Sequence, residues 1–179
     1  FMSNSFKTFL KHTAKDFHNQ SVNPPIVRAS TIIFKSMNDI RKTQAKYKKD
    51  PRGGYFDYGR QGTSTTHILQ KILSKLEESY YTFLTPTGFG SVFLAIFSVV
   101  RPGDEILTAD PVYNPTRMLT QDYLTEFGIK TTFYNPHDLD SIKRNITKKT
   151  KLIFVENPGS NTFEFQDLSK IIQIAKKHK

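Results

Sequence analysis

The chain has 179 residues, which is enough for one domain with a sizeable core and too few for two ordinary ones. It contains no cysteine, which excludes disulfides, thiolate metal sites and a cysteine nucleophile. No apolar run approaches the roughly 18 residues that a membrane-spanning helix needs, whereas the net charge of +10 makes a polyanion such as nucleic acid a partner to be weighed.

The first 25 or so residues are polar, weakly periodic and end in NPPI, which predicts an extended arm with one short helix. This start lacks the basic segment, the continuous apolar core and the small-residue cleavage site of a signal peptide. We therefore expect a soluble protein of the cytoplasm. Phe1 stands before a methionine, which is typical of the remnant of a removed tag.

Basic residues are spread along the chain and are densest at 42–52 and 176–179. Neither cluster carries a motif that reads nucleic acid, such as the aromatic-studded RNA-binding signature. Charge runs of this kind usually form solvated surfaces. The pattern therefore favours Lys-rich solvated faces over a nucleic-acid site, with a polyanion-binding protein as the alternative.

Regular alternation of strands and helices begins near residue 63. Apolar residues at helical spacing predict a helix over 66–78, with Ser64, Thr65 or Thr66 available as its cap. A short β-rich run follows at 80–85, then a mostly apolar helix over 88–100 and a turn at 101–104.

The remaining predicted strands span 104–109, 129–134 and 151–157, and the remaining predicted helices span 114–128, 138–146 and 167–179. Such alternation is typical of an α/β fold with a mostly parallel sheet and helices on both faces. In these folds ligands bind at the carboxyl ends of the strands.

The turn at 85–88 stands where a predicted strand ends and a predicted helix begins. The N–H groups of Gly88, Phe89 and Gly90 are therefore expected to be free, with the positive end of the helix dipole behind them. Such a helix start is suited to an anion. It is not a Walker A loop, and Phe93 occupies the position where a dinucleotide fingerprint needs its last glycine. A tight turn that needs glycine explains the stretch equally well.

Three further segments carry candidate binding residues. Tyr58 and Arg60 lie on a loop bracketed by glycines, and an arginine beside a phenol is suited to a phosphate dianion. Tyr113 follows a predicted strand and sits between two prolines. Another predicted strand ends at the same edge with Glu156, Asn157 and Ser160. Singly, each also has a plain structural explanation as a packed aromatic, a surface ion-pair partner or a turn.

Together these segments resemble one family. Their order is NPPI…ST, YGR-x-G, TG before a helix, D-x-x-Y-x-P and F-x-E-x-P, and it is similar to that of the pyridoxal-phosphate-dependent enzymes of cysteine and methionine metabolism. The E-x-PGS-x-T stretch looks most like cystathionine β-lyases, because γ-synthases and γ-lyases usually carry a Pro-flanked asparagine there. A γ-synthase, a γ-lyase or a methionine γ-lyase remains an alternative within the family.

The resemblance implies part of a fold-type-I large domain, a three-layer αβα arrangement with a mostly parallel sheet, in truncated form. Residues 1–60 would form an arm and loop that contribute to a neighbouring subunit. Residues 61–179 would form an incomplete domain for pyridoxal 5′-phosphate. The complete enzyme would be a homodimer or homotetramer with active sites shared between subunits.

The resemblance also implies how the cofactor phosphate is held. Gly88 and Phe89 would donate their backbone N–H groups to it, and Ser91 lies near enough to be a weaker candidate. Tyr58 and Arg60 would grip the same phosphate from the neighbouring subunit.

Two other residues are implied to act at the cofactor ring. Tyr113 would stack on the pyridine ring and act at the reacting centre, which makes it the catalytic candidate in this chain. Ser160 would bond the 3-oxygen of the ring. No metal is implied. The substrate would be a small sulfur amino acid, and the reaction would be β-elimination of cystathionine to homocysteine, pyruvate and ammonia.

The family further implies a Schiff-base lysine, an aspartate at the pyridine nitrogen and an arginine for the substrate carboxylate, all beyond Lys179. None of the nineteen lysines stands in the family's context. Cofactor chemistry needs that lysine, so we expect the chain alone to be inactive and to bind the cofactor weakly. Either a cut-out N-terminal piece or an interrupted reading frame would explain the length.

Overall fold

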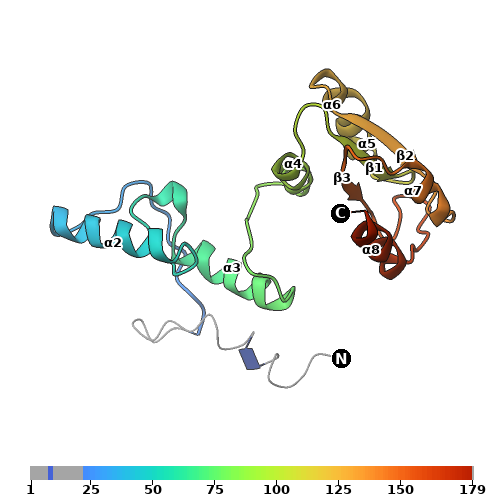
Figure 1. The fold of residues 1–179 in the computed structure, drawn as a ribbon. Coiled ribbons are helices and arrows are strands. Elements are labelled where there is room, and N and C mark those ends of the chain that lie inside the picture. Colours follow the sequence, from blue (N-terminus) through green and yellow to red (C-terminus); the bar gives the residue numbers. More distant parts are fainter. Residues whose placement is uncertain (1–7, 10–21, 179) are drawn as a thin grey trace. The chain divides into compact units, whose positions relative to one another are not determined.

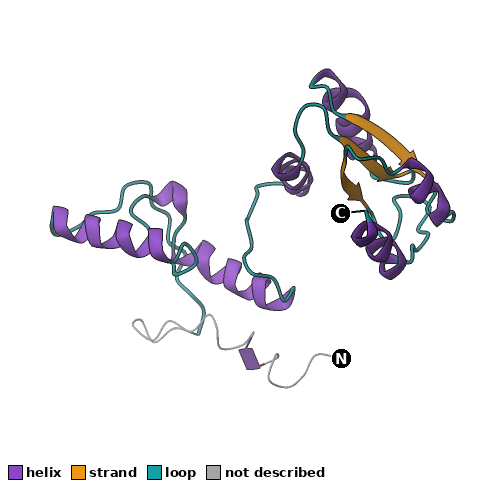
Figure 2. Cartoon of the chain, in the orientation of Figure 1, coloured by secondary structure: helices purple, strands orange, loops and turns teal. Residues whose placement is uncertain are grey.

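The computed structural model describes residues 8–9 and 22–178, which divide between two compact units, Phe1–Leu84 and Thr85–Lys179 (Figure 1). The short helix predicted in the N-terminal arm falls largely outside the described residues. All described strands belong to the second unit, as the colours of Figure 2 show. The predicted boundary near residue 60 separates an arm that contributes to a neighbouring subunit from a cofactor domain. It is a different kind of division from these two units, and it stays a prediction.

Helix α2 (Met37–Lys49) was not predicted. Its start is capped by Ser36, whose Oγ accepts the Asp39 N–H at 3.2 Å, and its last turn is rich in lysine, which suits the negative end of a helix. A serine followed three residues later by an acidic residue is a known helix-start signal. Helix α2 buries none of its residues, which agrees with the prediction that the lysines at 42–52 form a solvated face.

The loop that carries Tyr58 and Arg60 crosses the segment around Ser30. The Gly59 N–H donates to the Ser30 carbonyl at 2.7 Å, and Tyr58 pairs with Thr31 in an isolated antiparallel bridge. A Cβ on Gly59 would lie 1.7 Å from the Ala29 carbonyl oxygen, so only glycine allows this crossing. Gly59 therefore holds Tyr58 and Arg60 close to the crossing segment. A short 3₁₀ turn, η1 (Gly59–Gln61), begins at this glycine.

The helix predicted over 66–78 is confirmed as α3 (Ser64–Leu76). Its cap is Thr63, one residue before the three candidates, and the Thr63 N–H donates to Thr66 Oγ1 at 2.9 Å. No described residue between 22 and 84 is buried. This part of the chain therefore exposes large apolar side chains, including Ile33 at 93% and Phe83 at 73%.

The strand predicted at 80–85 is wrong, because this stretch is irregular in the structure. Aromatic and β-branched residues favour a strand only where a neighbouring strand satisfies their backbone groups. Among the described residues, the sheet holds three strands and none of them pairs with this stretch.

The second unit contains a parallel sheet of order β2-β1-β3. Its strands are β1 (Glu105–Ala109), β2 (Lys130–Tyr134) and β3 (Thr150–Phe154). Its helices are α4 (Gly88–Val99), α5 (Asn114–Met118), the π-helical turn η2 (Leu119–Tyr123), α6 (Leu124–Glu126), α7 (Leu139–Asn145) and α8 (Leu168–Lys177). The predicted alternation after residue 88 is therefore confirmed, and the helix predicted over 114–128 is a continuous run of three segments.

Buried clusters on both faces of the sheet define three layers. Neighbouring residues of β1 point to opposite faces, so Ile106 joins one cluster and Leu107 the other. The cluster toward α4 and α6 comprises Ile96, Val100, Ile106, Leu119, Leu124 and Ile129. The cluster toward α7 and α8 comprises Leu107, Ala109, Tyr134, Ile142, Ile171 and Ile174. The predicted placement of helices on both faces is confirmed (Figure 1).

Among the described helices, none has the length and apolar character needed to span a bilayer.

Helix α7 offers a test of the electrostatics of this unit. Asp138 caps it, and its Oδ1 accepts the Asp140 N–H at 3.0 Å. The hydrogen bond from Arg144, at 2.6 Å, is the main cause that lowers the pKa of the Asp138 carboxyl. Because the folded pKa lies below the unfolded value of about 3.9, the stabilisation is complete above that value and is lost as the pH falls through the folded pKa.

Acidification from about pH 5 to about pH 2 should therefore destabilise the second unit, and Asp138→Asn should make that dependence shallower. Asparagine keeps the capping oxygen but cannot titrate. Thermal melts followed by circular dichroism across this pH range measure the effect. Identical pH profiles for the variant and the parent chain would contradict the assignment.

Candidate functional site

The start of α4 presents two unpaired backbone donors. Thr87 caps the helix, and its Oγ1 accepts the Gly90 N–H at 3.0 Å, while its carbonyl accepts the Ser91 N–H at 3.2 Å. The N–H groups of Gly88 and Phe89 meet no acceptor among the described residues. Both residues are exposed. Two free donors at the positive end of a twelve-residue helix form a site that an anion can occupy.

The space beside Gly88 is open. A Cβ added there would have no protein atom within 4 Å, so a ligand can approach this backbone closely. The neighbouring hydroxyls are engaged with each other, because Thr85 Oγ1 donates to the Thr87 carbonyl at 2.8 Å and lies 2.6 Å from Ser91 Oγ. Ser91 must then be the donor in that pair. Its predicted role at the phosphate stays a prediction that requires this hydroxyl to turn.

The loops after β1 and β3 are tied together at the carboxyl edge of the sheet. The Tyr113 N–H donates to Glu156 Oε2 at 3.0 Å, and the Ser160 N–H donates to the Pro111 carbonyl at 2.7 Å. The Tyr113 side chain is 49% exposed, so its ring is available to a ligand. The structure therefore brings the loops of Tyr113 and Ser160 together, as the sequence predicted for this edge, while their roles toward a cofactor stay predictions.

Gln166 was not predicted as part of this region. It is buried, at 6% exposure, and its Nε2 donates to the Glu156 carbonyl at 2.8 Å. Its Oε1 accepts the Tyr134 hydroxyl at 2.7 Å, and its backbone N–H donates to Asn157 Oδ1 at 2.9 Å. A glutamine in a polar stretch gives no signal of such bonds, because they join residues that are 9 to 32 positions apart.

Arg117 was also not predicted. Its Nη2 bonds Asp110, at 2.6 Å to the carbonyl and 2.5 Å to Oδ1. Its guanidinium lies 3.9 Å from the centre of the Phe133 ring. Arg117 is therefore occupied within the protein, where it joins the loop after β1 to β2.

Tyr58 and Arg60 lie next to each other in the first unit. The Tyr58 hydroxyl is 3.0 Å from Ser30 Oγ, and the Arg60 guanidinium is 5.5 Å from the centre of the Tyr58 ring. Among the residues that the structure describes, Arg60 forms no ion pair. The phenol and the guanidinium therefore lie side by side, the phenol bonded to Ser30 and the guanidinium without an ion-pair partner among the described residues. Their action on the phosphate at α4 stays a prediction.

A cavity of about 320 Å³ opens beyond the ends of β1 and β2. Its lining includes Asp110, Tyr134, His137 and Glu164. The neighbouring Thr162 side chain is the main cause that lowers the pKa of the Glu164 carboxyl. In the described part of the chain, no group of three or more His, Asp or Glu side chains could hold a metal ion.

These features define a class of protein. A three-layer α/β unit with free N–H donors at a helix start, and an exposed aromatic ring at the carboxyl edge of its sheet, is suited to a ligand that combines a phosphate with a ring. The family described as "Cys/Met metabolism PLP-dependent enzyme" matches residues 7–179, and the chain belongs to it. The predicted resemblance is thereby confirmed.

Similar proteins agree with this family. Over 163 residues the chain is 34% identical to the cystathionine beta-lyase of Haemophilus influenzae, covering 91% of this chain and 40% of that protein. The Campylobacter jejuni protein described as "putative O-acetylhomoserine (thiol)-lyase", solved with N′-pyridoxyl-lysine-5′-monophosphate, is 27% identical to this chain. Its structure matches with a TM-score of 0.82 over 97% of this chain and 42% of that one. Cystathionine gamma-lyase from Lactobacillus plantarum, complexed with L-serine, is 25% identical, with a TM-score of 0.81 over 99% and 42%.

The predicted fold, part of a fold-type-I domain, is confirmed by these structures. The chain spans about two fifths of the length of each of these relatives.

Proposed function

We propose that the chain is the N-terminal portion of a cytoplasmic, pyridoxal-phosphate-dependent carbon–sulfur lyase that acts on cystathionine by β-elimination. The observation that carries the proposal is the free N–H pair of Gly88 and Phe89 beside open space, in a chain of this family. When bound, the cofactor supplies an electron sink for the amino-acid substrate. Its phosphate fits a helix start with two free donors.

Each candidate residue has a distinct task in this proposal. Gly88 and Phe89 hold the phosphate through their backbone. Tyr113, whose backbone N–H is bonded to Glu156, stacks on the ring and acts at the reacting centre. Ser160 presents a hydroxyl from the loop tied to Pro111.

We further propose that Arg60 and Tyr58 act on the phosphate of a second copy, in a homodimer or homotetramer. Two observations support this. Arg60 forms no ion pair among the described residues, and residues 22–84 bury none of their described side chains while exposing several large apolar ones. A surface of this kind is typical of a segment that packs against another chain.

The 179-residue chain alone should release no pyruvate from cystathionine, because none of its lysines stands in the context that the family resemblance implies. A coupled pyruvate assay on purified chain of verified mass measures this, with a complete family member as the positive control. Turnover that scales with the concentration of the chain would contradict the proposal of inactivity.

A γ-lyase or γ-synthase activity is the alternative within the family, since the Lactobacillus plantarum gamma-lyase shares the fold over nearly the whole chain. The β-lyase is preferred because of the E-x-PGS-x-T stretch that ends in Thr162 and because the Haemophilus influenzae relative is a β-lyase.

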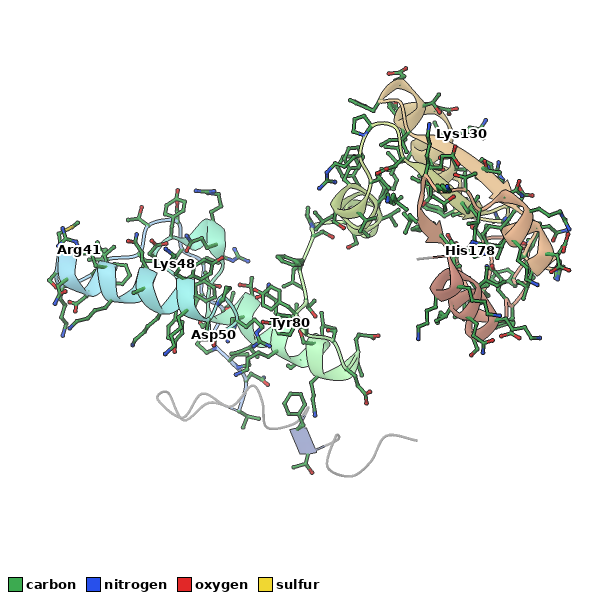
Figure 3. All side chains as sticks on the ribbon, in the orientation of Figure 1. Arg41, Lys48, Asp50, Tyr80, Lys130 and His178 are labelled. Atoms are coloured by element: carbon green, nitrogen blue, oxygen red, sulfur yellow. The ribbon has the colours of Figure 1, made fainter. Side chains whose placement is uncertain are left out.

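The alternative of another class is a non-catalytic polyanion-binding protein. Basic side chains such as Arg41 and Lys48 project from α2 (Figure 3). A salt titration of duplex DNA binding tests it, because affinity that depends on phosphate contacts falls steeply with salt. We expect no retention at about physiological salt. Micromolar affinity under those conditions would favour the alternative.

A further inference from the structure

We propose that Glu156 and Gln166 are positioning residues that hold Tyr113 at the ligand site. This inference rests on the proposed function, in which the Tyr113 ring faces the cofactor. Three hydrogen bonds connect the core to the Tyr113 backbone through these two residues.

The chain of bonds starts at a fixed donor. Tyr134, at the end of β2, is 1% exposed, and burial raises the pKa of its phenol, so the hydroxyl keeps its proton. It donates to Gln166 Oε1 at 2.7 Å. The amide orientation of Gln166 is thereby set, and its Nε2 faces the Glu156 carbonyl at 2.8 Å.

The chain of bonds ends at Tyr113. With its backbone held by Gln166, Glu156 places Oε2 at 3.0 Å from the Tyr113 N–H. The Tyr113 carbonyl is also engaged, because it accepts the N–H groups of Thr116 and Arg117 at 2.9 and 3.0 Å. Both backbone polar groups of Tyr113 are therefore fixed while its ring is half exposed. Bonds to a carboxylate are stronger than neutral ones, which makes Glu156 the key contact.

The sheet offers a matched control at its opposite end. Glu105, at the start of β1, accepts the Thr147 hydroxyl at 2.6 Å across 42 positions, and Glu156 accepts the Tyr113 N–H across 43. Both glutamates tie a β1 segment to a β3 segment. Only one of them lies at the edge that carries the site.

The experiment compares Glu156→Ala, Glu156→Gln and Glu105→Ala in the full chain. Hydrogen exchange of the Tyr113 amide reports the bond, with the Leu107 amide in the core as the reference for global unfolding. Binding of pyridoxine 5′-phosphate, which has the ring and the phosphate but no aldehyde to react with lysines, reports the site. Glu156→Ala should speed hydrogen exchange of the Tyr113 amide about tenfold and lower the affinity for pyridoxine 5′-phosphate by several fold.

Glu156→Gln should give values between those of Glu156→Ala and the parent chain, because it keeps an acceptor oxygen but loses the charge. Glu105→Ala should change neither value. If Glu156→Ala leaves Tyr113 exchange unchanged relative to Leu107, the inference is overturned. Equal probe binding by Glu156→Ala and the parent chain also overturns it, while leaving the proposed function intact. If the parent chain binds no probe but Tyr113 exchange responds as expected, the positioning bond stands and the proposed function fails.

Discussion

Replacing Ile106 by alanine should lower the free energy of unfolding of the second unit by about 2–5 kcal/mol. Ile106 is fully buried in the central strand and packs in the cluster that joins β1 to α4. Truncation removes apolar contacts and leaves a cavity that the flanking layers cannot fill, since β1 is paired on both sides. Urea titration followed by circular dichroism measures the change.

The matched control is Ile172→Ala on α8. Ile172 is 52% exposed, so the same truncation there should cost well under half as much. Equal losses for the two variants would contradict the layered core. A loss at Ile106 below about 1 kcal/mol would do the same.

Replacing Arg60 by alanine should weaken binding of pyridoxine 5′-phosphate about tenfold or more. A charge-assisted hydrogen bond is worth roughly 1.5–3 kcal/mol, and each 1.4 kcal/mol is about a factor of ten in affinity. Since the proposal places Arg60 at the site of a second copy, the loss should appear chiefly at protein concentrations where the chain self-associates. Isothermal titration at two protein concentrations, with sedimentation to define the association state, measures it.

Arg41→Ala is the control for charge alone. It removes the same positive charge from α2, outside the proposed site, and should leave affinity within about twofold, because exposed charges are screened by salt over roughly 8–10 Å. If both variants weaken binding equally, the anion is attracted by net charge and not gripped by Arg60. If Arg60→Ala has no effect in the associated state, the shared site is wrong.

Much of the second unit could be predicted because its sequence pattern is local. The β1 segment is a short apolar run flanked by turn residues. The helical run at 114–126 is followed by Gly128, whose φ of +72° is one that glycine favours. The stretch at 80–85 has an equally strong β composition and yet forms no strand, since strand formation depends on a partner that composition does not reveal. Helix α2 buries none of its residues and so carries little apolar periodicity, and the signal that could have predicted it is its Ser36 cap.

In the candidate site, too, the residues that could be predicted are those whose role depends on local sequence. Gly88 and Phe89 could be recognised because their free N–H groups follow from their place at the first turn of a helix. Gln166 and Arg117 could not, because their roles arise from contacts between separate strands. The engagement of Ser91 with Thr85 was likewise invisible, since it depends on the rotation of two hydroxyls.

The most direct test of the central claim is a titration of the ¹⁵N-labelled chain with pyridoxine 5′-phosphate, followed through backbone amide chemical shifts. The account predicts that the amides of Gly88 and Phe89 shift first and most, as their N–H groups gain an acceptor, and that Tyr113 shifts with the same saturation curve. Shifts confined to the basic residues of α2 and α8, with Gly88 and Phe89 unmoved, would contradict it.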